Sequence, residues 1–145
     1  MVSLSESKEF DSIEQLTLFV KEKLDSLSYE VICAAYLDNE NNLIALIELS
    51  GGTQNNVDAN IEELIAYAFS INCKSIVLYH NHPSGSSVPS ESDIVATKRL
   101  YRIAFVNGIV LKDHIVVSKS GYHSIFSVSP DITLWYAIRS SPFSR

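Results

Sequence analysis

The chain has 145 residues, of which 46% are hydrophobic and 19% are charged, and this composition excludes a disordered or collagen-like protein. The length predicts one ordinary domain with a single core. The formal net charge of −6 argues against nucleic-acid binding over a whole face, although a local basic patch stays open. No apolar run is long enough to cross a bilayer, and the first residues do not form a secretory signal, so we expect a cytoplasmic protein.

The first predicted elements are a helix and a hairpin. Apolar residues at helical spacing predict a helix over residues 13–27, with Asp11 or Ser12 as its N-cap. Two apolar runs, Tyr29–Leu37 and Leu43–Leu49, flank an Asn-rich turn, which is typical of two paired strands. The N-terminal part is therefore predicted to form one helix followed by two strands.

The rest of the chain alternates helices with strands. Residues after Pro130 are ambiguous. The expected elements are a loop over 51–56, a helix over 61–71, a buried strand Ser75–Tyr79, a loop His80–Pro89, a helix from the Ser90 cap to Val106 closed by Gly108, and strands Ile109–Leu111, His114–Val117 and Tyr122–Ile125. This order predicts a mixed sheet that helices cover.

Two cysteines, Cys33 and Cys73, lie in apolar segments and lack CxxC spacing. Free cysteine is among the most buried residue types. We therefore expect two buried, reduced thiols rather than a disulfide or a cysteine-rich zinc site.

The chemistry concentrates where the predicted buried strand ends. His80 and His82 are two residues apart in extended chain, so their side chains point to the same side. Asp93, in the first turn of the next helix, can reach the same point if the loop folds back. Zinc in catalytic sites takes three such ligands and leaves a fourth position open to water. The alternative is two exposed loop histidines, with Ser90 and Asp93 merely capping a helix, and spacing alone leaves both open.

The spacing HxHP, six residues, Ser90, two residues, Asp93 resembles the signature of JAMM (MPN-type) metalloproteases. The segment HNHPSG from His80, with Thr97 and the later Asp113–Ile115, resembles more closely the RadC-like branch of that family, over about Tyr29 to Ile125. The resemblance implies an α/β (α+β) fold, with a mixed, mostly antiparallel sheet flanked by helices in three layers, as in cytidine deaminases. It also implies a domain over residues 29–145, on which an N-terminal helix in residues 1–28 packs as part of one unit.

The same resemblance implies a role for each matched residue. His80, His82 and Asp93 would bind Zn²⁺, the expected cofactor. Glu30 would be the general base that takes a proton from water and delivers it to the leaving amine. Ser90 would help hold the oxyanion, although one hydroxyl does not easily serve as oxyanion donor and N-cap at once.

The identity of the general base and the role of Asp113 and His114 each have an alternative. Glu62 and Glu63 open the helix before the histidine strand and could supply the base instead of Glu30, although they look like first-turn dipole residues. Asp113 and His114 match a family position, which makes them a second layer around the metal or part of a substrate cleft. Their alternative is a hydrogen-bonded packing pair.

The resemblance implies a zinc-dependent metallopeptidase or isopeptidase that cleaves an amide bond of a peptide or protein. The alternative is a non-catalytic metal-binding or protein-interaction module with DNA-repair or mobile-element partners. RadC proteins commonly carry a helix-hairpin-helix region ahead of this domain, and too few residues precede Glu30 for one, so we expect no DNA contact from it. Tyr29 stands where relatives often place arginine. A zinc nucleobase deaminase would need HxE with PCxxC, and the chain has neither.

Overall fold

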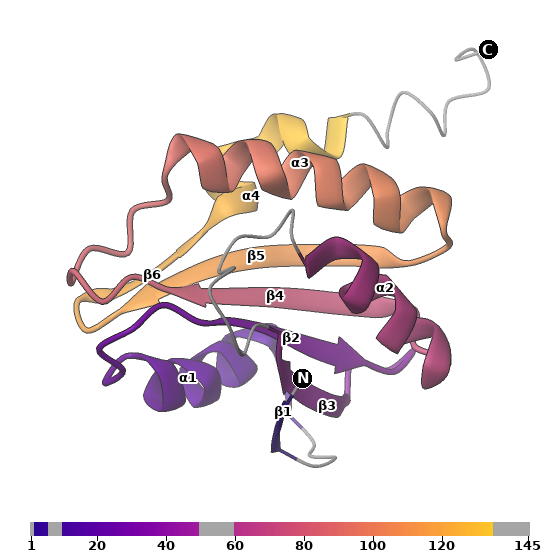
Figure 1. Ribbon diagram of the computed structural model, residues 1–145, viewed down its shortest axis with the longest axis horizontal. Helices are drawn as coiled ribbons and strands as arrows, with labels where there is room; N and C mark the ends of the chain where they lie inside the picture. The colour runs from indigo at the N-terminus through magenta and orange to yellow at the C-terminus, as the bar shows by residue number, and fades with distance from the viewer. Residues whose placement is uncertain (1, 6–9, 50–59, 135–145) are drawn as a thin grey trace.

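The computed structural model describes residues 2–5, 10–49 and 60–134, which form one sheet with helices on both faces (Figure 1). In chain order the elements are β1 (Val2–Ser5), α1 (Ile13–Leu24), β2 (Ile32–Leu37), β3 (Leu43–Glu48), α2 (Ile61–Ser70), β4 (Ser75–Asn81), α3 (Glu91–Val106), β5 (Val110–Ser118), β6 (Gly121–Ser124), α4 (Ile125–Val128) and the 3₁₀ helix η2 (Pro130–Thr133).

The sheet has the strand order β1-β3-β2-β4-β5-β6. Only the β4–β5 pair is parallel among the described strands, and α3 makes the crossover that a parallel pair requires. The other neighbours are antiparallel. The expected mixed, mostly antiparallel sheet flanked by helices is therefore confirmed.

Both faces of the sheet are buried, which explains why β2 reads as an unbroken apolar run. Alternate residues of a strand point to opposite faces, so Cys33 and Ala35 pack towards α1 while Ile32 and Ala34 pack towards α2 and α3. Figure 1 shows α1 on one side of the sheet and α3 on the other. The result is three layers with a hydrophobic core on each side of the sheet.

The predicted helix caps are confirmed. Ser12 caps α1 by accepting from the Gln15 N–H, and Ser90 caps α3. Gly108 follows α3 with φ +76°, the left-handed conformation that glycine adopts without a side-chain clash. Both cysteines are free, with 0% of Cys33 and 3% of Cys73 exposed, as expected.

Three strand predictions need correction. The histidine strand does not end at Tyr79, because β4 continues to Asn81 and pairs His80 with Ile32 of β2. The separate strands Ile109–Leu111 and His114–Val117 are one strand, β5, whose register shifts opposite Ile76 and Val77 of β4. Leu111 pairs with Ile76 and Asp113 with Val77, so Lys112 is the extra residue at this irregularity.

The N-terminal strand β1 was not predicted, and it pairs with β3. The loop expected over 51–56 lies outside the described residues. Packing of α1 on the sheet is observed, whereas the boundary at residue 28 stays a prediction. Within the described parts of the chain, no helix is both long and apolar enough to cross a membrane.

Candidate metal centre

Antiparallel pairing of β2 and β4 brings Glu30 and His80 together. Ile32 at the start of β2 pairs with His80 near the end of β4, so the chain just before β2 lies beside that histidine. His82 follows β4 directly, and Asp93 lies in the first turn of α3. Sequence-distant residues thus meet at one end of the sheet.

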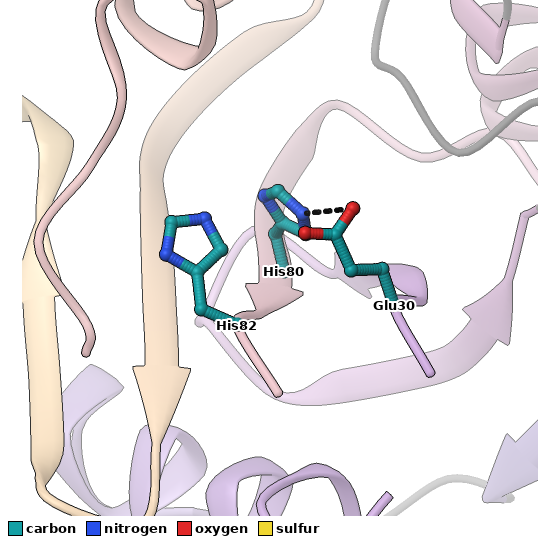
Figure 2. Close-up of side chains that lie close together, drawn as sticks. All are labelled: Glu30, His80 and His82. Carbon is teal, nitrogen blue, oxygen red and sulfur yellow. Dashed lines mark ion pairs between the residues drawn. The ribbon is translucent and has the colours of Figure 1, made fainter. Parts of the chain in front are cut away.

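Glu30, His80 and His82 form a group whose size suits a metal ion. Each can offer one ligand atom such that these atoms all lie within 4.8 Å of one another. His80 Nε2 is 3.7 Å from Glu30 Oε2, which is beyond hydrogen-bond distance. Figure 2 shows the Glu30 carboxylate against the His80 ring, with His82 on the chain just past the strand. The His80 and His82 ring centroids are 4.9 Å apart.

Asp93 touches both histidines from the helix side. Its Oδ1 is 3.6 Å from His80 Nδ1, and its Oδ2 is 3.3 Å from His82 Nε2. Burial by itself raises the pKa of the Asp93 carboxyl, but hydrogen bonding from Ser90 opposes this effect, and the net result is a lowered pKa. Asp93 is therefore a carboxylate at neutral pH, as a metal ligand must be.

His80 provides the strongest indication that a cation fits here. Among the described residues neither of its ring nitrogens has a hydrogen-bond partner, although both are buried. Burial lowers the pKa of His80 and prevails over the opposing effects of Asp93 and Glu30, so the ring is neutral. A buried polar atom without a partner is rare and costly, and imidazole nitrogen with carboxylate oxygen is a donor set that zinc prefers.

His82 presents one nitrogen to the same point. Its Nδ1 is 3.1 Å from the Ser86 carbonyl oxygen, which can only accept, so in the neutral ring Nδ1 carries the proton. The Nε2 lone pair then faces Asp93 Oδ2. Two electron-rich atoms at this separation repel each other unless a proton or a cation lies between them.

The end of β5 and the β5–β6 turn hold the loop that carries His82. The His82 N–H donates to the Val117 carbonyl, and the Ser120 hydroxyl donates to the Gly85 carbonyl at 2.7 Å. Gly85 has φ +100°, which disfavours any other residue there. These bonds fix the loop against the sheet.

Asn81, which the sequence analysis did not single out, holds the segment around Glu30. Its side chain is 1% exposed, accepts from the Val31 N–H at 2.7 Å and donates to the Tyr29 carbonyl at 2.9 Å. The backbone on both sides of Glu30 is thereby tied to β4. The sequence does contain a sign of this role. Asn81 is a polar residue between two histidines, and in an extended strand its side chain points to the face opposite theirs.

Ser90 and Asp93 form a capping box at the start of α3. The Ser90 hydroxyl accepts from the Asp93 N–H, and the Ser90 N–H donates to Asp93 Oδ2 at 3.0 Å. Ser90 is exposed and lies outside the Glu30, His80 and His82 group. Its predicted cap is confirmed, while its role towards an oxyanion stays a prediction.

The two alternative bases are not among the residues grouped around His80, within the part of the chain described here. Glu62 lines an apolar hollow between α2 and α3 with Phe69 and Ile103. Asp113 accepts from the Ser124 hydroxyl and from the His114 N–H, and so joins β5 to the end of β6. That arrangement is the packing role considered for Asp113.

Comparison with known proteins identifies the family of the chain. The family model of the RadC-like JAB domain matches residues 10–129, so the chain belongs to this family. Similar proteins include a UPF0758 protein of Actinobacillus pleuropneumoniae serotype 5b, 41% identical over 70% of this chain and 46% of its own length. One from Streptococcus sanguinis is 35% identical over 77% of this chain and 49% of its own length. The chain thus spans about half the length of these curated relatives.

Proposed function

We propose that the chain is a zinc-dependent hydrolase that cleaves an amide or isopeptide bond of a peptide or protein. The observation that carries the proposal is His80, a buried neutral imidazole between two carboxylates with both nitrogens unpartnered among the described residues. Membership of the JAB family supports the same chemistry. Zinc, when bound, would lower the pKa of a water molecule and polarise the substrate carbonyl.

In this proposal His80, His82 and Asp93 hold the metal, and Glu30 moves the proton. The Glu30 side chain is 45% exposed, so it reaches both the cluster and the solvent from which substrate arrives. Its carboxylate takes a proton from the attacking water as the water oxygen bonds to the carbonyl carbon. The carboxyl group then returns that proton to the nitrogen as the C–N bond breaks, leaving a carboxylate and an amine.

Ser90 can act as cap and oxyanion donor together. As an N-cap its hydroxyl uses a lone pair, which accepts from the Asp93 N–H at 3.1 Å. Accepting this bond does not use the proton of the Ser90 hydroxyl. In the hydrogen bond between Ser90 and Ser92, whose hydroxyl oxygens are 3.1 Å apart, Ser92 can be the donor. The Ser90 proton is then available to the oxygen that gains negative charge.

The proposed substrate is any peptide or protein with a suitable amide bond, and no individual substrate is proposed. DNA-repair-related protein partners follow from the resemblance alone, and the cytoplasmic location follows from the short apolar runs and the first residues of the sequence, so both stay predictions.

Metal content per chain tests the proposal. We expect about one zinc in protein purified without chelator or affinity metal, and almost none in His82→Ala, because three ligands are the usual minimum for a catalytic zinc. His123→Ala is the matched control, since His123 bonds Ser87 and lies outside the cluster. A wild-type protein that takes up no zinc, even when zinc is added, would contradict the proposal.

A wild-type protein that binds zinc but cleaves no peptide or isopeptide substrate would favour the other expectation, a non-catalytic metal-binding module. Screening therefore follows the metal assay and uses both peptide libraries and isopeptide-linked substrates.

A further inference from the structure

His114 is a buried imidazole beside His80 to which the proposed function gives no role. It lies in β5 opposite Leu78 of β4, two residues before His80, and is 0% exposed. The His80 and His114 ring centroids are 6.1 Å apart. His114 is therefore an inner neighbour of the cluster, on the face of the sheet that α3 covers.

Thr97 fixes the proton on His114. The Thr97 hydroxyl donates to the Asp93 carbonyl oxygen at 2.6 Å, and the same oxygen atom of Thr97 is 2.6 Å from His114 Nδ1. A hydroxyl has one proton, and a carbonyl oxygen can only accept. His114 Nδ1 must therefore be the donor to Thr97, which leaves Nε2 with a lone pair when the ring is neutral.

Nε2 of His114 is thus an acceptor that lacks a donor. Among the described residues the buried side-chain nitrogens and oxygens without a partner are His80 Nδ1, His80 Nε2 and His114 Nε2. All three belong to two adjacent rings. Leaving a buried polar atom without a partner destabilises the fold, so the clustering of these three atoms points to a state of the site in which they are paired.

We propose that His114 is a positioning residue of the metal centre, whose Nε2 accepts a hydrogen bond from the His80 ring and so fixes which nitrogen of His80 faces the metal. The inference rests on the proposed function. A histidine ligand gives one nitrogen to the metal and needs an acceptor for the N–H of the other. At a ring-centroid separation of 6.1 Å, the connection would require a turn of the His80 ring or one bridging water.

The other side chains around His80 have different tasks in the proposed function. Asp93 and His82 are metal ligands, and Glu30 handles the proton of the water. Beside the His80 ring, His114 Nε2 is a buried acceptor that has no partner among the described residues and no task in the proposed function. Thr97 links it back to the Asp93 backbone, so one chain of contacts joins two of the three ligands.

Nitrogen NMR of the wild-type protein tests the tautomer and its response to zinc without any substitution. We expect His114 Nδ1 to be protonated and Nε2 to show the shift of an unprotonated ring nitrogen in the metal-free protein. On adding zinc, Nε2 should move in the direction of hydrogen-bond acceptance while Nδ1 stays. A protonated Nε2 without metal, or an Nε2 signal that zinc leaves unchanged, overturns the proposal.

Two variants supply a second readout in a competition titration with zinc and a chromophoric chelator. In His114→Asn an amide can still donate to Thr97, but no atom replaces Nε2, and we expect zinc affinity to fall about 10–100-fold. His114→Gln puts a polar amide near the Nε2 position and should recover part of that loss. A merely structural role predicts changed melting temperatures in both variants with unchanged zinc affinity.

The titration also separates this inference from the proposed function. If the wild type and His114→Asn bind zinc equally tightly, the proposed role of His114 is contradicted, whereas the proposed metal centre is supported. A wild-type chain without affinity for zinc removes both. If His114→Asn does not fold, the nitrogen NMR of the wild-type protein decides the matter.

Discussion

At the scale of residues, the cluster is short of positive charge. His80 is neutral because burial lowers its pKa, while Asp93 stays ionised because hydrogen bonds from Ser90 help to lower its own. The Glu30 carboxylate lies on the other side of His80. A negative cluster with unpaired imidazole nitrogens is the environment that a divalent cation stabilises, which is why a metal fits better than a set of hydrogen bonds.

Replacing Glu30, the proposed base, tests whether this residue transfers the proton without being needed to bind the metal. We expect Glu30→Gln to keep the zinc content of the wild type and to lower the rate of hydrolysis by about 10²–10⁴, because an amide cannot take the proton of water. Elemental analysis and turnover of one substrate by both proteins give the two numbers. Glu62→Gln, the same change on α2, is the matched control and should alter neither.

The contrary result has a definite meaning, because the Glu30 carboxylate also belongs to the group of atoms within 4.8 Å. Loss of zinc from Glu30→Gln to the same extent as from His82→Ala would make Glu30 a ligand and leave the proton transfer to another group.

At the scale of elements, the first turn of α3 has two tasks. Its capping box satisfies backbone N–H groups that a helix start leaves without partners, and it orients the carboxylate that faces both histidines. The sequence pattern of Ser90 and Asp93 predicted the box, because capping is a local interaction. The pattern could not show that the loop folds back far enough to bring Asp93 to the histidines.

A pair of serine caps separates these tasks. Ser12→Ala in α1 and Ser90→Ala in α3 each remove a hydroxyl that accepts from the N–H three residues on, at 3.1 Å in both. We expect each to lower the free energy of unfolding of the metal-free protein by about 1 kcal/mol. Only Ser90→Ala should weaken zinc binding, because only that cap helps hold a proposed ligand.

Urea unfolding with chelator present, followed by zinc competition titration, measures both effects. Equal zinc affinities in the two variants would show that Asp93 keeps its position without the Ser90 hydroxyl.

Strand boundaries were harder to predict than helix starts, and for a physical reason. The serines, prolines and glycine after Tyr79 indicated a loop, yet pairing of His80 with β2 and of Asn81 with β5 keeps the chain extended to Asn81. Lys112 and Asp113 lie between the two strands expected from the sequence, yet pairing with β4 continues past them. In both places hydrogen bonds to a sequence-distant strand outweigh the local preference, and a single sequence does not contain those bonds.

At the scale of the whole molecule, the site exists only because the sheet forms. Spacing alone indicated that His80 and His82 converge, whereas Glu30 entered through the family resemblance. Its position depends on the antiparallel register of β2 and β4 and on the hydrogen bonds of Asn81 to either side of it. Contacts of this kind, like those of Thr97 with His114, join elements that the sequence separates and therefore could not be foreseen.

The buried histidines also make the stability of the whole fold depend on pH. Burial, with a smaller effect of the neighbouring His80, lowers the pKa of His114 to about 3 from its ordinary value near 6.5. Between these two pH values, the His114 ring is protonated in the unfolded chain but stays neutral in the folded chain. The contribution of His114 to the stability of the metal-free protein is therefore fully present above about pH 6.5 and is lost progressively as the pH falls towards 3.

The size of this loss follows from the same shift. His114 alone should reduce the free energy of unfolding by about 2 kcal/mol between pH 7 and pH 5, and His80 adds to it because its pKa is lowered too. Asp113 opposes the trend, since burial raises its pKa. Urea unfolding of wild type and His114→Gln at the two pH values, with chelator present, isolates the His114 contribution as a difference. The variant should lose about 2 kcal/mol less than the wild type, and equal losses would mean that His114 is protonated as readily in the fold as in the unfolded chain.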